Sequence, residues 1–195
     1  MIRLAKREDT KQIVPLIVQA IEDIVFMLTG TSSYEQAIPI LEYYVQSEQN
    51  RLSYNNCLVK ETEGKVVGLI IAYHSSELSV LDREMLEIIS RNLNLQNVQV
   101  DREADDEDFY IDTLSVHPDY QGKGIGTELL NGLLSYAKDK GVTRVSLNVD
   151  QDKPSVRRLY EKVGFKYEKV RYIMKHPYDY LVFPINKKIF QTKVV

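Results

Sequence analysis

The sequence predicts a single α/β domain, because segments with strand and helix periodicity alternate along its 195 residues. In the segment Val142 to Val149, the apolar Val145, Leu147 and Val149 alternate with polar residues, which is typical of a strand. From Thr127 to Lys140 apolar side chains recur at helical spacing, and Gly141 follows as a helix stop. Hydrophobic residues form 44% and charged residues 27% of the chain, as in ordinary globular proteins. We therefore expect one domain over residues 1–195.

The first half of the chain is expected to form a short strand, two helices and a hairpin. Gly30 and the small residues after it end the first helix, and Gly68 inside the second hairpin strand indicates a bulge or a close contact. The expected elements are strands at 2–5, 57–61 and 66–73, a helix from Asp9 or Thr10 to Leu28, and a helix at about 34–47.

The second half is more regular, with strands and helices in alternation. Pro154 suits the first turn of a helix, and Gly164 suits its end. The expected elements are strands at 109–116, 142–149, 167–174 and 180–186, and helices at 127–140 and 154–163.

Residues 74–108 are less regular and are interpreted as an insertion before the central strand. Leu81 to Leu93 has helical spacing. The stretch from Asp101 to Asp108 holds six acidic residues and one arginine. A solvated loop is the simpler interpretation of that stretch, and an acidic lip that attracts a cationic substrate is the alternative.

Composition excludes several functional classes. The net charge of −3 provides no basic footprint for nucleic acid. Cys57 is the single cysteine, so no intramolecular disulfide is expected, and its apolar neighbours favour a core position over a nucleophile. The residue spacing of a metal site is missing, so we expect no metal. We find neither an apolar signal region nor a membrane-spanning stretch, which predicts a cytoplasmic protein without a membrane partner.

A glycine-rich loop stands between the strand at 109–116 and the following helix, in the segment Gln121-Gly122-Lys123-Gly124-Ile125-Gly126. Glycines allow tight turns and close approach of a ligand, and the free N–H groups of a helix start favour an anion. A tight turn without a ligand is the alternative, although one glycine usually suffices for a turn.

Three phosphate-binding motifs compete for this loop. A nucleotide-triphosphate loop requires Ser or Thr after Gly122-Lys123, where this chain has Gly124. The dinucleotide fingerprint counted from Gly122 would place its third glycine at Thr127, so it fails as well. The coenzyme A loop of acetyltransferases, Q/R-x-x-G-x-G/A, matches at Gln121, Gly124 and Gly126.

At this point the chain resembles the GNAT family of N-acetyltransferases. The segment 114–126 is similar to the central signature of that family, and Leu159-Tyr160-Glu161-Lys162-Val163-Gly164-Phe165 is similar to its second signature. The opening Ile2-Arg3-Leu4-Ala5, followed by Asp9, also resembles the family. The resemblance implies a mixed central sheet with a splayed strand pair and helices on both faces. It also implies acetyl-CoA as cosubstrate.

The resemblance implies a set of residues for the cosubstrate. Main-chain groups of the strand before the loop would pair with pantetheine, and the loop would hold the pyrophosphate. Family members often have asparagine where this chain has Lys153, which puts one polar contact in doubt, although Lys153 could reach a phosphate. The expected set is Leu114, Ser115, Val116, Gln121, Gly122, Lys123, Gly124, Ile125, Gly126, Thr127, Asn148, Lys153 and Ser155.

Two residues are expected to act in the chemistry. Tyr160 matches the family tyrosine that donates a proton to the leaving thiolate, and a core tyrosine is the alternative. Strand alternation would place Asp112 on the same face as Leu114 and Val116, where a carboxylate would orient the amine or a relaying water. A surface aspartate, with a water chain as the base, is the alternative for Asp112.

The resulting function is acetyl transfer from acetyl-CoA to a primary amine, with a small cationic molecule as the favoured acceptor. Acetylation of a protein or peptide, and acetyl-CoA sensing without turnover, are the alternatives. A homodimer is also compatible with the family resemblance.

Overall fold

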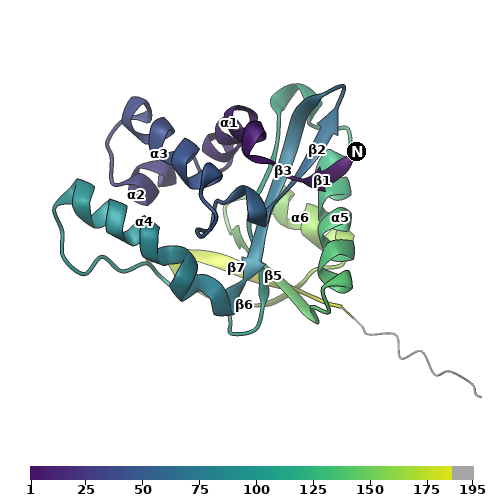
Figure 1. The fold of residues 1–195 in the computed structure, drawn as a ribbon. Helices are drawn as coiled ribbons and strands as arrows, with labels where there is room; N and C mark the ends of the chain where they lie inside the picture. Colours follow the sequence, from purple (N-terminus) through teal and green to yellow (C-terminus); the bar gives the residue numbers. More distant parts are fainter. Residues whose placement is uncertain (186–195) are drawn as a thin grey trace, which may run out of the picture.

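A seven-stranded mixed sheet forms the centre of the molecule, in the order β1-β2-β3-β4-β5-β7-β6 (Figure 1). The computed structural model describes residues 1–185. Neighbouring strands are antiparallel except for the parallel pair β4 and β5. The strands are β1 (Ile2–Leu4), β2 (Cys57–Thr62), β3 (Lys65–His74), β4 (Phe109–Val116), β5 (Arg144–Asp150), β6 (Lys166–Ile173) and β7 (His176–Pro184).

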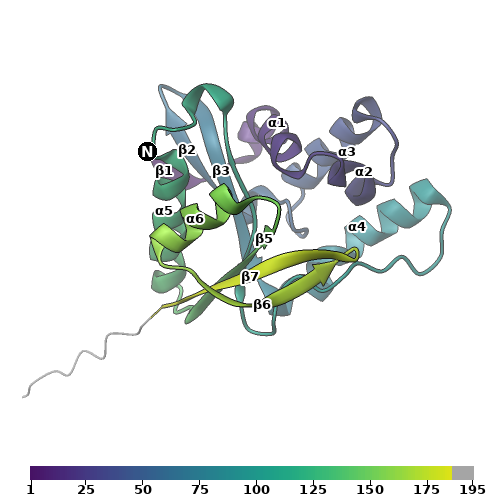
Figure 2. The same cartoon turned by 180° about the vertical axis from the view of Figure 1, so that it is seen from behind.

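Helices cover both faces of the sheet, each above its own apolar core. The first core lies under α1 (Thr10–Ile21), α2 (Ile24–Thr29), α3 (Tyr34–Gln46) and α4 (Leu78–Leu93). The second lies under α5 (Ile125–Asp139) and α6 (Pro154–Val163), which share one side of the molecule in Figure 2. The predicted mixed sheet with helices on both faces is confirmed.

Two boundaries differ from the sequence prediction. The helix expected to run to Leu28 is two helices, because Glu22 adopts a positive φ of 48° after α1 ends. The last strand begins at His176 instead of Tyr180, because Met174 and Lys175 both have positive φ and turn the chain directly into β7. The end predicted for that strand, Asn186, lies outside the described residues.

Strands β4 and β5 diverge after a short contact. Only three residue pairs join them, the last being Ile111 with Leu147. Beyond it, β4 stays paired with β3 as far as Val116, and β5 stays paired with β7 as far as Asp150. The predicted splayed pair is therefore present, and the gap opens at the carboxyl ends of the two strands.

A β-bulge at Asp112 changes the faces of β4. Thr113 is opposite Ile71 and Ile111 is opposite Ala72, so Asp112 has no partner on β3. One extra residue reverses the alternation that follows it. Asp112 therefore contacts Tyr73 in the first core, whereas Leu114 packs against the second. The prediction that Asp112 and Leu114 share a face is wrong.

Gly68 lies where the backbone and a neighbouring helix come too close for a side chain, as its position inside a strand indicated. A Cβ there would lie 3.0 Å from the Ser115 carbonyl oxygen and 3.1 Å from Leu129 Cδ1. The register of β2 and β3 also shifts next to it, between Lys60 and Glu61.

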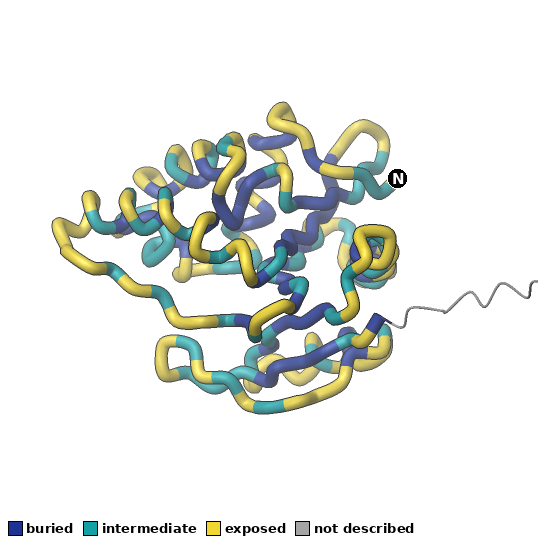
Figure 3. Tube along the Cα trace, turned by 60° about the horizontal axis from the view of Figure 1, so that its bottom comes forward, coloured by how far each residue is buried: buried dark blue, intermediate teal, exposed yellow. Residues whose placement is uncertain are grey.

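Burial follows the central strands, as the dark trace through the middle of Figure 3 shows. The connection from β3 to β4, residues 75–108, contains α4 and then a largely exposed strand-free run that becomes buried again at Ala104 and Asp108. Across residues 1–185 we find no helix with the length and apolarity that crossing a membrane would require.

Candidate active site

The gap between β4 and β5 opens into a cavity of about 690 Å³. The α1–α2 turn, the ends of β4 and β5, the start of α6 and the β6–β7 turn all contribute to its wall. Six of the thirteen predicted cosubstrate residues and both predicted catalytic residues line this cavity. Those that line the cavity are Asp112, Leu114, Ser115, Val116, Gln121, Asn148, Lys153 and Tyr160.

The N–H and C=O groups of every second residue of β4 point into this gap. The His117 N–H donates to the Val67 carbonyl on β3, at 2.9 Å. In an antiparallel ladder the N–H and C=O of one residue point the same way, and the direction alternates along the strand. The main-chain groups of Leu114 and Val116 therefore point away from β3, into the gap.

Two side-chain amides already donate hydrogen bonds to one of these main-chain groups, the Val116 carbonyl. The Val116 carbonyl accepts from Gln121 Nε2 at 3.0 Å and from Gln19 Nε2 at 2.9 Å. Gln19 comes from α1 and carries no motif, so the sequence did not indicate its role. The main chain of Leu114 is left as the open edge that an extended ligand could pair with.

The glycine loop joins this edge to the start of α5. Gly122 and Gly124 have φ of 73° and 81°, values that favour glycine, and Gly124 is the residue before the helix. The Glu128 N–H is bonded to the Gly124 carbonyl. The N–H groups of the residues between them, Ile125, Gly126 and Thr127, lie in the first turn, where a helix provides no partner of its own.

Lys123 has local contacts at the loop. Its Nζ donates to the Asp119 carbonyl at 2.8 Å and lies over the Tyr120 ring, 4.9 Å from the centroid. The exposed ammonium therefore adds positive charge beside the helix start, where it favours an anion.

Tyr160 extends from α6 into the cavity wall and is 8% exposed. Its ring packs edge-on against Phe165, with centroids 5.8 Å apart. Burial raises the pKa of Tyr160 to about 12. Within residues 1–185 the hydroxyl has no hydrogen-bond partner, so it is protonated at neutral pH and free to donate.

Asn148 on β5 is held by its amide nitrogen. Nδ2 donates to the Glu103 carbonyl at 2.7 Å and to the Tyr110 hydroxyl at 3.0 Å. Its Oδ1 is buried without a partner among the described residues. Such an oxygen is free to accept from a ligand.

Asp112 is oriented by two hydroxyl groups. Tyr73 Oη donates to its Oδ2 at 2.5 Å, and Thr113 Oγ1 donates to its Oδ1 at 2.9 Å. Burial and the nearby Asp112 carboxylate raise the pKa of Tyr73 well above its ordinary value, so this hydroxyl remains a donor.

The acidic stretch from Asp101 to Asp108 is only in part a solvated loop: Asp106 and Glu107 are exposed, whereas other carboxylates are paired with the sheet. Asp105 pairs with Lys169 and Arg171, and Asp108 pairs with Arg144 at 2.6 Å. Asp101 accepts from the main-chain N–H of Met174. The stretch is therefore a strap that its paired carboxylates bind to the sheet, and its partners are far away in sequence.

The two predicted residues at the start of α6 differ. Lys153 lines the cavity, and its Nζ lies 3.6 Å from Glu22 Oε1 in the α1–α2 turn. Ser155 is exposed and is not part of the cavity wall. The structure thus brings Lys153, but not Ser155, to the candidate site.

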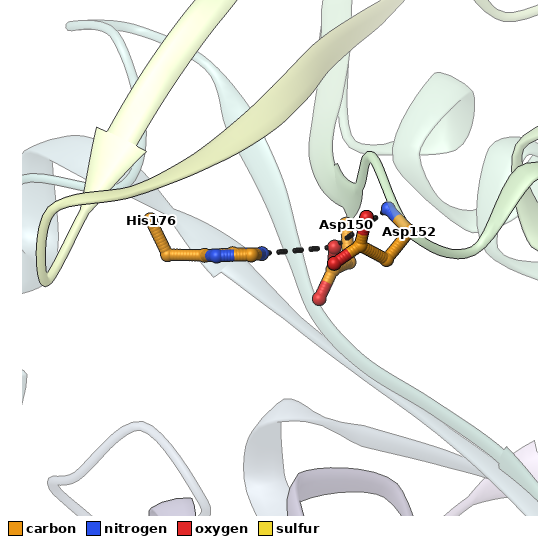
Figure 4. Close-up of side chains that lie close together, drawn as sticks. All are labelled: Asp150, Asp152 and His176. Carbon is orange, nitrogen blue, oxygen red and sulfur yellow. Dashed lines mark hydrogen bonds and ion pairs between the residues drawn. The ribbon is translucent and has the colours of Figure 1, made fainter.

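Asp150, Asp152 and His176 come together at the end of β5 (Figure 4). His176 Nε2 lies 2.9 Å from Asp150 Oδ1, and the Asp152 N–H donates to the same oxygen at 2.8 Å. Burial opposes ionisation of Asp150, yet these hydrogen bonds lower its pKa below the ordinary value. The trio holds the β6–β7 turn against β5, and the absence of a metal stays a prediction.

The comparison with known families agrees with this geometry. Residues 26–165 match the model of the acetyltransferase (GNAT) family. The chain belongs to that family. Members of this GNAT family are acyl-CoA-dependent N-acyltransferases that use acetyl-CoA, so the predicted family and enzyme class are confirmed.

Individual relatives agree with the family assignment. The chain is 28% identical to a probable N-acetyltransferase, camello, of Xenopus tropicalis over 135 residues, which is 69% of this chain and 49% of that relative. A crystal structure of an acetyltransferase is 30% identical, with a TM-score of 0.80, over 95% of this chain and all of the other. An N-acetyltransferase from Staphylococcus aureus Mu50 is 28% identical, with a TM-score of 0.78, over 94% of this chain and all of the other.

Substitution of Gly124 tests the loop as the pyrophosphate site. Gly124→Ala places a side chain at φ 81°, which costs about 1–2 kcal/mol and reorients the adjoining N–H groups. We expect the coenzyme A Kd to rise about tenfold or more in calorimetric titration. Gly126→Ala is the control, because its Cβ would lie 3.6 Å from Leu159 Cδ2 at an ordinary φ. A wild-type coenzyme A Kd in Gly124→Ala would contradict the loop assignment.

Proposed function

We propose that this protein transfers an acetyl group from acetyl-CoA to the primary amine of a small cationic molecule. The single observation that carries the proposal is the open β4 edge between the glycine loop and Tyr160. A thioester held along that edge would reach from the start of α5 to the cavity. The curated relatives are matched over about half of their length or less, and their activities are their own.

The cosubstrate fits the donors of this site. The N–H groups of Gly122 to Thr127, together with the charge of Lys123, would hold the pyrophosphate. The open main chain of Leu114 would pair with the pantetheine arm, and its N–H would stabilise the oxyanion of the thioester carbonyl. Lys153, at the cavity wall, would add a polar contact to the arm.

The reaction requires two proton movements. The amine must be neutral to attack, although an alkylammonium has a pKa near ~10. Asp112, or a water that it orients, would accept that proton. A new C–N bond forms at the acetyl carbon, the C–S bond breaks, and the thiolate takes a proton from Tyr160. The Tyr160 hydroxyl, on a largely buried side chain at the cavity wall and still protonated at neutral pH, suits this last step.

The charge of the cavity supports a cationic acceptor. Five carboxylates line it, from Glu22, Asp23, Glu103, Asp112 and Asp150, against the two cations Arg51 and Lys153. An excess of negative charge in a concave site concentrates cations. The support therefore comes from residues that the fold gathers, and not from the acidic stretch as a whole.

Removal of the Tyr160 hydroxyl tests the proposed acid. We expect Tyr160→Phe to lower kcat about 10²-fold, because the thiolate then leaves without a proton donor. The phenyl ring keeps the packing on Phe165, so the coenzyme A Kd should remain that of the wild type. With a Tyr160 pKa of about 12, wild-type turnover should also show no decline between pH 7 and about pH 10.

The role of Tyr160 is measured by comparing the rate of thiol release from acetyl-CoA in the wild type and in Tyr160→Phe, across a panel of amines. Unchanged turnover in Tyr160→Phe would remove the tyrosine from the mechanism. If coenzyme A binds and no amine supports thiol release, the protein is a sensor and the proposed activity is wrong.

Asp112→Asn tests the proposed base. The amide oxygen can still accept from Tyr73, and the amide nitrogen can donate to the Thr113 hydroxyl, so the bulge is retained while the proton acceptor is lost. We expect kcat to fall about 10²-fold near pH 7 and to recover as the pH rises, because more of the amine then arrives deprotonated. The pH–rate profile, with Asp106→Asn as an exposed control, provides the comparison. A wild-type profile in Asp112→Asn would exclude this role.

A further inference from the structure

A charged cluster at the cavity wall gathers side chains from three separate segments. Arg51 follows α3, Asp82 and Glu103 belong to the connection between β3 and β4, and Asp112 belongs to β4. Arg51 Nη1 lies 2.7 Å from Glu103 Oε1, and Arg51 Nη2 lies 2.9 Å from Asp82 Oδ2. Tyr110 Oη donates to Glu103 Oε2 at 3.0 Å.

The cluster contains more negative than positive charge. Arg51, 5% exposed, is the one cation among three carboxylates. Two of the guanidinium N–H groups of Arg51 donate to Asp82. Arg51 therefore donates only one hydrogen bond to Glu103. Burial raises the pKa of Glu103, Arg51 lowers it and Asp112 raises it again, with a net increase. A further cation beside Glu103 would offset the unpaired charge.

Glu103 is also open to a ligand. Its side chain is 25% exposed, and both it and Asp112 line the cavity. Asn148, whose Nδ2 bonds the Glu103 main chain, contributes a buried Oδ1 without a partner among residues 1–185. Two carboxylates and one amide oxygen make three acceptors, and a primary ammonium has three N–H donors and no acceptor.

The part of the wall that α2, α4 and the β6–β7 turn contribute is apolar. α2 contributes Ile24, Met27 and Leu28, and α4 contributes Met85. Met174 lines the cavity from the β6–β7 turn. Side chains of this kind favour a hydrocarbon body, and on this part of the wall the additional charges of a polyamine or the hydroxyls of an amino sugar would lie without partners.

We propose that Glu103 is a specificity-determining residue that binds the acceptor's ammonium group, and that the acceptor is a primary amine on an apolar body. The inference deepens the proposed function, because it names the class of amine for the same cavity. The connection between β3 and β4 then has a direct part in acceptor choice, since it provides both Glu103 and Met85.

Calorimetric titration of coenzyme A-saturated protein with 2-phenylethylamine tests the ammonium contact without requiring turnover. Glu103→Gln is the variant, because its amide keeps the size of the side chain and still accepts from Arg51 or Tyr110. Glu107→Gln is the matched control, an exposed carboxylate on the same strap. 2-Phenylethanol serves as the neutral analogue of the amine, and spermidine as a cation without an apolar body.

We expect Glu103→Gln to weaken 2-phenylethylamine binding about tenfold or more, the usual effect of a lost charged hydrogen bond. Binding of 2-phenylethanol should change less than about twofold, and Glu107→Gln should bind both as the wild type does. Spermidine should bind the wild type more weakly than 2-phenylethylamine.

Three results would overturn the inference: no 2-phenylethylamine binding by the wild type, equal loss of the amine and the alcohol in Glu103→Gln, or tighter binding of spermidine. A parallel thiol-release assay separates this inference from the proposed function. If the amine binds in a way that depends on Glu103 but no thiol is released, the proposed activity is wrong and the inference about Glu103 stands. If other amines are acetylated and Glu103→Gln does not change their turnover, the inference about Glu103 is wrong and the proposed activity stands.

Discussion

The divergence of β4 from β5 is the constraint on which the rest of the site depends. Each strand is held on its outer side, β4 by β3 and β5 by β7, so neither can follow the other after Ile111 and Leu147. The open backbone between them would be costly without a partner. Gln19 and Gln121 satisfy its end, and the family's thioester cosubstrate fits the open main chain of Leu114. The glycine loop follows one end of this edge, and Tyr160 lines the cavity into which the gap opens.

The acidic strap shows how one charge pattern can serve two purposes. Asp105 and Asp108 use their carboxylates against Lys169, Arg171 and Arg144, which binds the strap to the sheet. Glu103, in the same stretch, reaches the cavity and shares Arg51 with Asp82. The strap can therefore contribute Glu103 to the cavity while Asp105 and Asp108 hold it against the sheet.

Sequence alone was sufficient wherever a local pattern carried the information. The glycine spacing, the helix around Tyr160 and the succession of strands and helices along the chain predicted the fold and eight residues of the cavity wall. Periodicity failed at Asp112, because a bulge is defined by pairing with β3 and leaves no local signal. It failed at Glu22 for a related reason, since a single positive φ divides a helix whose apolar pattern continues. The partners of Glu103 are equally non-local, since Arg51 lies 52 residues away.

The most direct test of the splayed gap as the cosubstrate site is the amide spectrum of isotopically labelled protein during titration with coenzyme A. The Leu114 amide and those of Ile125 to Thr127 should shift and gain protection from exchange as the ligand pairs with them. The His117 amide should stay protected throughout, because it is bonded to the Val67 carbonyl on β3. Saturation with coenzyme A that leaves the Leu114 amide unshifted and unprotected would contradict binding in the gap.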